Sequence, residues 1–179
     1  AFEVIVVDNN SSSDVRDYLR ELSADNIKIV LNDVNYGFSY AVNQGAGLAS
    51  VWADIVILNN DAWLERGSLE ILQRAVYDSS DIAIAIPRQI VPAGTPETHL
   101  HVPYAAVDVP CDVSLSSHHK NIVSIDLFHD GSKVELNFAP FFCAYIKRSV
   151  WDACGGLDYQ NGRHYRSDRI MCDMVKHVY

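Results

Sequence analysis

The sequence predicts an α/β fold in which a mostly parallel central sheet is flanked by helices. Short apolar runs of strand length alternate with segments of helical periodicity through the first 87 residues. Each run is followed by Asp, Asn or Pro, residues that favour turns and end strands. Repeated strand–helix–strand units of this length need crossover connections, and such connections give parallel strands with helices on both faces.

The elements of this half follow in a regular order. Strands are expected at residues 2–7, 27–31, 55–58 and 82–86, where apolar and mostly β-branched residues dominate. The first helix is expected to follow the cap residues Ser11–Ser13, since apolar residues then recur at helical spacing as far as Leu22. Two further helices are expected at 38–49 and 68–77.

The pattern changes after residue 87. Residues 88–132 hold four of the six prolines and five of the seven histidines, and they predict an irregular or hairpin excursion. One or two strands are expected within 134–147, followed by a short helix at 149–153. The last helix carries apolar residues on one face from 170 to 178, and Asp168 would lie in its first turn.

Length and composition predict one domain over 1–179, with a first half at 1–87 and a second at 88–179. Of the 179 residues, 49% are hydrophobic, which suffices for a sizeable core. The chain starts inside a predicted strand and stops inside a helical pattern. We therefore expect a piece of a longer protein, truncated at both ends. No run of apolar residues is long enough to predict a transmembrane segment.

Charge and cysteine content limit the classes of function. The formal net charge of −9 argues against broad nucleic-acid binding, which needs a basic face. A nucleotide remains an acceptable ligand, because a carboxylate-bound cation can supply the positive charge that a diphosphate requires. The four cysteines are widely spaced and form no CxxC pair. They predict small buried hydrophobic residues in a reducing compartment, and hence a cytoplasmic protein.

Polar residues follow three of the predicted strands and suggest a ligand site. Asp8-Asn9-Asn10 follows the first strand, Asn35-Tyr36-Gly37 the second and Asn59-Asn60-Asp61 the third. Open α/β sheets bind ligands at the carboxyl ends of their strands. A carboxylate such as Asp61 suits Mg²⁺ or Mn²⁺, which prefer oxygen ligands. Turn formation and helix capping explain any one of these clusters equally well, but explain the set of three less well.

These motifs resemble a known family. Residues 4–11 (VIVVDNNS), 35–38 (NYGF) with Asn43, 58–61 (LNND) and 155–158 (GGLD) are similar to the inverting GT-A glycosyltransferases of family 2, in particular the rhamnosyltransferase-like enzymes. The resemblance implies a GT-A-like fold that binds nucleotide-diphospho-sugars. Members of this group begin with one more strand and helix before the segment that corresponds to 2–8.

The resemblance also implies roles for individual residues. A nucleotide-sugar donor would be bound by residues at three strand ends and on the helix after the second strand, namely Asp8, Asn9, Ser11, Asn35, Gly37, Asn43 and Asn60. Asp61 would bind Mg²⁺ or Mn²⁺, and Asn59 replaces an acid that many relatives carry. Asp168 would be the catalytic base, with Ser167 in place of the usual Glu. The arginines at 163, 166 and 169 would lower the pKa of Asp168, bind phosphate or lie in solvent.

The expected partners are a UDP-, GDP- or dTDP-sugar donor and a glycan or lipid-linked acceptor, met in the cytoplasm or at the inner face of the membrane. Acceptor recognition would fall to residues 88–136.

A sugar-1-phosphate nucleotidyltransferase is a weaker interpretation of the sequence, since no Gly-rich basic loop is present. A catalytically silent binding or scaffolding domain of a glycan-assembly protein is another, favoured by Asn59 and Ser167. Stacking of a sugar on Trp63, Tyr104 or Phe141-Phe142, and a zinc site among His99, His101, Cys111 and His118-His119, are weaker hypotheses.

Overall fold

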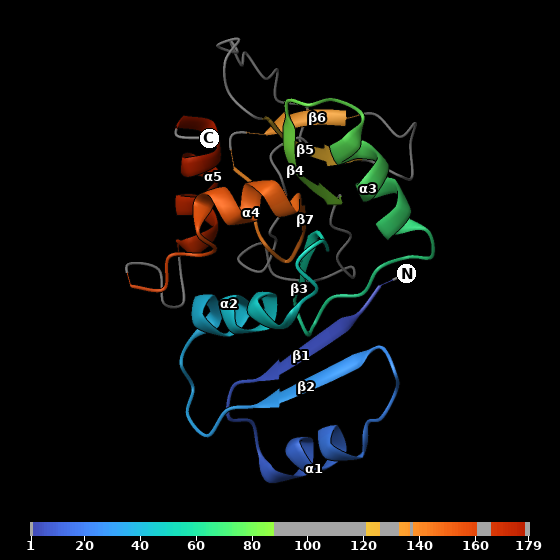
Figure 1. Cartoon of the computed structure of the whole chain (residues 1–179), viewed down its shortest axis with the longest axis vertical. Coiled ribbons are helices and arrows are strands. Elements are labelled where there is room, and N and C mark those ends of the chain that lie inside the picture. Colours follow the sequence, from blue (N-terminus) through green and yellow to red (C-terminus); the bar gives the residue numbers. More distant parts are fainter. Residues whose placement is uncertain (1, 88–120, 126–132, 137, 161–165, 178–179) are drawn as a thin grey trace, which may run out of the picture. The chain divides into compact units, whose positions relative to one another are not determined.

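The computed structural model describes residues 2–87, 121–125, 133–136, 138–160 and 166–177 (Figure 1). The chain divides into two compact units. Unit 1 comprises residues 1–53 and 156–167, and unit 2 comprises residues 54–155 and 168–179. These boundaries do not coincide with the two predicted halves, and the prediction of a single domain over the whole chain stays a prediction.

Unit 1 is built on two parallel strands. Its elements are β1 (Val4–Asp8), α1 (Ser13–Glu21), β2 (Ile27–Leu31) and α2 (Phe38–Leu48). Val4 pairs with Ile27 and Asp8 pairs with Leu31, so both strands end at the same edge. Helices α1 and α2 flank this strand pair (Figure 1). Helix α2 lies so close to β1 that a Cβ atom on Gly45 would be 3.3 Å from Cγ2 of Val7.

Unit 2 contains a mixed five-stranded sheet. Its elements are β3 (Ile55–Leu58), α3 (Ser68–Tyr77), β4 (Ile82–Pro87), β5 (Asn121–Ile125), β6 (Lys133–Leu136), β7 (Cys143–Ile146), α4 (Arg148–Cys154) and α5 (Ser167–His177), whose first residue belongs to unit 1. The strand order is β3-β7-β4-β5-β6. Strands that are neighbours in the sheet are thus often distant in the sequence.

The described strands do not show the mostly parallel central sheet that the sequence predicted. Only β1–β2 and β4–β5 are parallel, whereas β3–β7, β4–β7 and β5–β6 are antiparallel. Strand β7 comes from the second half of the chain and lies between β3 and β4, antiparallel to both. Periodicity predicts each strand locally but carries no information about this long-range insertion.

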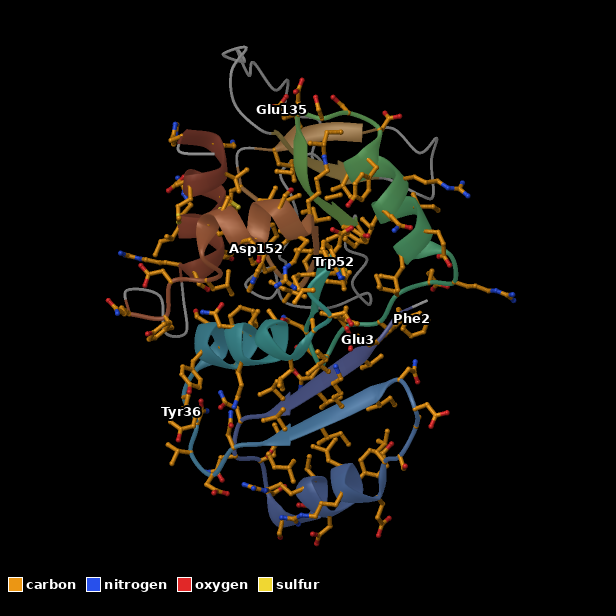
Figure 2. The ribbon with its side chains drawn as sticks, in the orientation of Figure 1. Phe2, Glu3, Tyr36, Trp52, Glu135 and Asp152 are labelled. Carbon is orange, nitrogen blue, oxygen red and sulfur yellow. The ribbon has the colours of Figure 1, made fainter. Side chains whose placement is uncertain are left out.

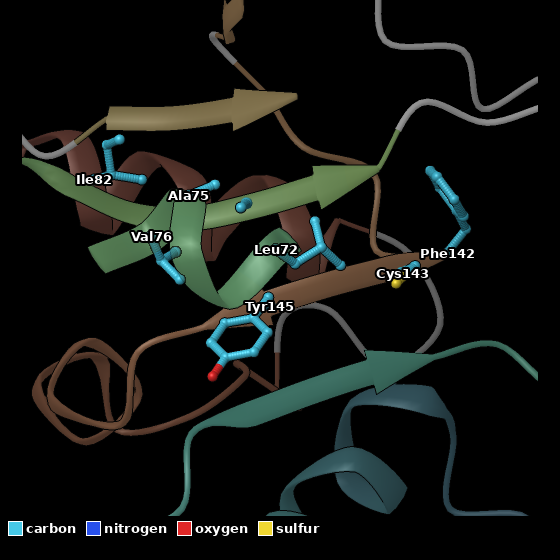
Figure 3. Close-up of a cluster of buried hydrophobic side chains, with 8 residues drawn as sticks. Leu72, Ala75, Val76, Ile82, Phe142, Cys143 and Tyr145 are labelled. Carbon is cyan, nitrogen blue, oxygen red and sulfur yellow. The ribbon is translucent and has the colours of Figure 1, made fainter. Parts of the chain in front are cut away.

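The core of unit 2 forms where α3 packs against β4 and β7 (Figure 3). Successive turns of α3 bring Leu72 and Val76 onto the sheet, and every residue of β4 is buried. The cluster consists of Leu72, Ala75, Val76, Ile82, Ala85, Phe142, Cys143 and Tyr145. Burial on this scale makes apolar packing the main source of stability in unit 2.

One carboxylate fastens the beginning of β3 to its neighbours. Asp54 accepts hydrogen bonds from the Tyr145 hydroxyl at 2.8 Å and from the Tyr77 hydroxyl at 3.0 Å. It also accepts the backbone N–H of Arg148 at 2.8 Å, where α4 begins. Burial, and then the bond to Asp54, raises the pKa of Tyr145. Asp54 thus links β3, α3, β7 and α4 within unit 2.

Most predicted elements are confirmed in type and position. Strands β2 and β3 and helix α3 have the predicted bounds, and residues 134–147 resolve into β6 and β7. Strand β5 lies inside the stretch predicted to be an irregular or hairpin excursion, and it pairs antiparallel with β6. Residues 88–120 and 126–132 of that stretch lie outside the described residues. Within the described ranges, no helix has the length and apolar character needed to span a membrane.

Candidate functional site

Asp8 is the last residue of β1, and its carboxylate is buried within unit 1. The residue is 5% exposed, and its carboxylate accepts the backbone N–H of Ser11 at 3.2 Å. The guanidinium of Arg16 lies 3.8 Å from the second carboxylate oxygen. A carboxylate that is removed from water in this way needs such partners, because burial of an unpaired charge is costly. Asp8 therefore holds the β1–α1 turn in shape.

Arg16 joins the ends of both strands of unit 1. Besides Asp8, it donates hydrogen bonds to the side chain of Asn10 at 3.2 Å and to the backbone carbonyl of Asn32 at 2.9 Å. It also pairs with Asp33 at 3.1 Å. The sequence analysis missed Arg16, although its place near the N-terminus of α1 is informative. A cation there opposes the helix dipole, which favours a carboxylate partner nearby.

Asn9 organises the loop between β2 and α2. Its side-chain amide donates to Asn35 Oδ1 at 3.0 Å and to the Gly37 carbonyl at 3.1 Å, and its oxygen accepts the backbone N–H of Tyr36 at 3.1 Å. Asn35 Oδ1 also accepts the N–H of Gly37 at 2.9 Å. Gly37 has φ 93°, a conformation that favours glycine. The side chain of Asn9 thus fixes the loop at 35–37.

Two further amide side chains fix helix α2 to its surroundings. Gln44 and Asn32 exchange hydrogen bonds at 2.9 and 3.0 Å, a reciprocal pair that the sequence analysis did not find. Asn43 donates to the carbonyl of Leu157 at 2.7 Å and accepts the N–H of Leu157 at 2.8 Å. Asn43 therefore anchors the Gly-Gly-Leu-Asp turn, which is 114 residues away in the sequence.

The predicted donor-binding residues of unit 1 are therefore brought together in part. At the ends of β1 and β2, Ser11 donates to Asp8, and Asn9, Asn35 and Gly37 are joined by hydrogen bonds of their own. We call this set of five residues the polar edge. Within this set Ser11 and Asn35 are exposed, whereas Asp8 is buried. Asn43 bonds to Leu157 and lies outside the set. A fixed polar edge with exposed hydroxyl and amide groups can bind a polar ligand at little entropic cost.

Asn60 and Asp61, the remaining candidates near β3, occupy a turn in unit 2. The backbone N–H of Asn59 extends the β3–β7 ladder to the carbonyl of Phe142 at 2.9 Å. The N–H of Ala62 then bonds to the carbonyl of Asn59 at 3.2 Å, which closes a turn with Asn60 and Asp61 at its exposed corner. β3 thus ends at Leu58, as predicted, and Asp61 lies in the turn that follows it. The role of Asp61 as a metal ligand stays a prediction.

A divalent cation fits Asp61 only if another molecule completes its coordination. The described residues contain no group of three or more His, Cys, Asp or Glu residues that is suited to a metal ion. Mg²⁺ at phosphate sites is commonly bound through one or two carboxylates together with substrate phosphates and water. A single exposed carboxylate at a strand end suits that mode and does not form a complete protein cage.

Asp168 lies in the first turn of α5, as predicted. It is half-buried, and its Oδ1 accepts the backbone N–H of Arg169 at 2.7 Å. Arg169 lies 3.7 Å from the carboxylate of Asp173 on the same helix. Arg166 is exposed with φ 72°, and Arg163 lies outside the described residues. Asp168 thus presents a carboxylate at a helix start.

The weaker hypotheses fare differently. Phe141 and Phe142 are buried, as the core interpretation held, whereas Trp63 is 79% exposed. Tyr104 and the proposed zinc ligands lie outside the described residues. Cys143, Cys154 and Cys172 are free thiols, and burial raises the pKa of Cys143 and Cys172 to about 12. The buried thiols therefore behave as small hydrophobic side chains, whereas Cys111 lies outside the description.

Comparison with known proteins places the chain in a family. Parallel strands whose carboxyl ends gather polar side chains are typical of nucleotide-binding α/β proteins. Residues 1–154 match the family model of Glycosyl transferase family 2, which covers most of the chain. The chain therefore belongs to this family of nucleotide-sugar glycosyltransferases with a GT-A-like α/β fold. Searches of curated proteins and of solved structures found no match.

Proposed function

We propose that this chain transfers a hexosyl or deoxyhexosyl group from a UDP-, GDP- or dTDP-sugar to an acceptor hydroxyl, with inversion at the anomeric carbon. The acceptor is a glycan or a lipid-linked glycan, and the reaction belongs to polysaccharide or glycan biosynthesis. The observation that carries the proposal is the hydrogen-bonded polar edge of unit 1 in a chain that belongs to glycosyl transferase family 2.

On the donor side, the residues divide into supporting and contacting groups. Asp8 and Asn43 support the site, because their polar atoms bond to Ser11, Arg16 and Leu157. Ser11, Asn35 and Asn60 are exposed and provide hydroxyl and amide groups for the nucleotide. Asn9 and Gly37 fix the loop through which Asn35 is presented. In this division, the buried groups set the shape of the site and the exposed groups bind the ligand.

Asp61 is the proposed ligand of Mg²⁺ or Mn²⁺, which is shared with the donor diphosphate. Such a cation offsets the negative charge that develops on the departing nucleoside diphosphate. The exposed position of Asp61 after β3 supports this role, since the carboxylate is accessible to a bound diphosphate. Because the described residues contain no group of three or more potential metal ligands, we expect the cation and the nucleotide to bind together.

Asp168 is the proposed general base. Its carboxylate takes the proton of the acceptor hydroxyl while the acceptor oxygen attacks the anomeric carbon. The bond between that carbon and the diphosphate oxygen breaks on the opposite face, and its electron pair leaves with the nucleoside diphosphate. The half-exposed position of Asp168 in the first turn of α5 supports this role, because a base must reach the substrate.

The variant Asp168→Asn tests the catalytic proposal. The amide keeps the size of the side chain but cannot accept the proton, so sugar transfer is expected to fall by about 10²-fold or more. Binding of the nucleotide, measured by calorimetry, should change little. Asp173→Asn on the exposed side of the same helix is the matched control and should retain activity. Equal transfer by Asp168→Asn and the wild type would remove Asp168 from the mechanism.

The silent-domain interpretation makes a different prediction for the same assay. Asn59 and Ser167 favour it, because each stands where the resemblance places an acid of the metal site or of the catalytic pair. A silent domain would bind nucleotide sugar but show neither transfer nor slow hydrolysis of the donor.

We also propose a cytoplasmic location for the reaction, at the inner face of the membrane when the acceptor is lipid-linked. The free thiols support a reducing compartment.

A further inference from the structure

Unit 1 carries a cluster of three tyrosines beside the polar edge. Tyr36 lies on the loop between β2 and α2 (Figure 2), Tyr40 lies in the first turn of α2, and Tyr159 follows the Gly-Gly-Leu-Asp turn. The ring centroids of Tyr36 and Tyr40 are 4.8 Å apart, and those of Tyr40 and Tyr159 are 5.9 Å apart. We call these three residues the tyrosine cluster.

The tyrosine cluster is assembled by contacts that hold distant segments together. Asn43, one turn after Tyr40, exchanges two hydrogen bonds with the backbone of Leu157, two residues before Tyr159. On the other side, the Asn9 side chain accepts the backbone N–H of Tyr36. The backbone segments that carry the rings are therefore held by the same amide contacts that organise the donor-binding residues of unit 1.

The rings remain accessible although they touch one another. Tyr36, Tyr40 and Tyr159 are 44%, 38% and 49% exposed. Single exposed aromatic residues are common on protein surfaces, but three rings gathered from separate segments form a contiguous aromatic surface. Rings that already support one another lose little side-chain entropy when a ligand binds.

We infer that the tyrosine cluster binds a pyranose ring of the acceptor, an inference that rests on the proposed function. The C–H groups on one face of a pyranose carry a partial positive charge, which complements the negative face of an aromatic ring. The interplanar angle is 41° between Tyr36 and Tyr40 and 87° between Tyr40 and Tyr159, so neither of these pairs forms a parallel slot that would enclose a flat nucleobase. Their stepped surface suits a puckered sugar instead.

The test is a titration of the full chain, whose tyrosine rings carry ¹³C and are followed by NMR. Methyl glycosides of glucose, galactose, mannose, rhamnose and N-acetylglucosamine are added in turn. At least one glycoside should shift the ring signals. In the double variant Tyr40→Ala/Tyr159→Ala its affinity should fall by about tenfold, because stacking on each ring contributes a factor of a few. Tyr40→Phe/Tyr159→Phe keeps the ring faces and should retain the affinity.

Controls separate this inference from the proposed function. Tyr18→Ala, a 65% exposed tyrosine on α1, should leave glycoside binding unchanged, and Tyr36→Ala replaces the double variant if the latter does not fold. Binding of UDP, GDP and dTDP, measured on the same samples, should be equal in the wild type and the cluster variants. The inference is overturned if no glycoside binds, if the alanine variants bind glycoside like the wild type, or if they lose nucleotide and glycoside binding together.

Discussion

The two units of the chain are stabilised by different means. Among the described residues, the buried hydrophobic side chains of unit 1 are Ala46 and Leu157, whereas unit 2 holds all the others. Four of the five buried polar residues, Asp8, Asn32, Ser39 and Ser167, belong to unit 1. Unit 1 is thus specified mainly by hydrogen bonds and an ion pair, and unit 2 mainly by apolar packing.

This difference has a functional consequence. A net hydrogen bond contributes about 1 kcal/mol to stability, while a fully buried Leu side chain contributes about 1.5–3 kcal/mol. Unit 1 gains geometric definition from its polar contacts but comparatively little stability. Its polar edge carries most of the proposed donor-binding residues, so a bound nucleotide should stabilise unit 1 more than unit 2, because a ligand stabilises the folded state that binds it.

The largest expected loss of stability comes from a cavity in the core of unit 2. Leu72 is 1% exposed and packs in the α3–β4–β7 cluster. Leu72→Ala should reduce the free energy of unfolding of unit 2 by about 2–5 kcal/mol. Urea denaturation followed by circular dichroism measures this loss. Arg74→Ala, an exposed position on the same helix, should change it by less than about 0.5 kcal/mol, and an equal effect of both variants would contradict the packing account.

In unit 1, the corresponding effect should come from a polar residue. Asn43→Ala leaves the N–H and the carbonyl of Leu157 without their partner, which should cost about 1–3 kcal/mol. Hydrogen exchange read by mass spectrometry should then rise for the peptide that spans α2. Peptides from β4 should be unaffected. Asn26→Ala, at an exposed turn position, is the control, and unchanged exchange in Asn43→Ala would show that the amide contacts contribute little.

The smallest expected effect is a pH dependence of the stability of unit 1. Glu3 accepts hydrogen bonds from Lys28 at 2.7 Å and from the backbone of Ser50 at 2.6 Å, which lowers its pKa from 4.5 to about 2. Because the folded-state pKa is depressed, the stabilisation is present above pH 4.5 and is lost as pH falls toward 2. Glu3→Gln should flatten this dependence in acid unfolding curves, whereas Glu21→Gln should not.

The sequence predicted local structure well because local patterns determine it. The bounds of β2, β3 and α3 follow from apolar runs and helical spacing. The insertion of β7 between β3 and β4 was not predictable in this way. That arrangement depends on pairing between segments about ninety residues apart, such as Ile55 with Ile146.

For the candidate site, the residue types were predictable but their partners were not. Turn chemistry and strand ends singled out Asp8, Asn9 and Asn35. The position of Arg16 in the first turns of α1 favours a carboxylate partner but does not identify it as Asp8. Nothing local indicated that Asn43 bonds to Leu157 across 114 residues. Which candidate residues support the donor site and which contact the donor could therefore be proposed only from the three-dimensional contacts.

The central claim is that this chain binds a nucleoside diphosphate together with a divalent cation. Calorimetric titration with UDP, GDP and dTDP, with and without Mn²⁺, tests it most directly. The account predicts Mn²⁺-dependent binding of one nucleotide, lost in Asp61→Ala and retained in Asp152→Ala, which alters an exposed acid on α4. Binding that is independent of Mn²⁺ and of Asp61, or the absence of binding by every nucleotide, would contradict it.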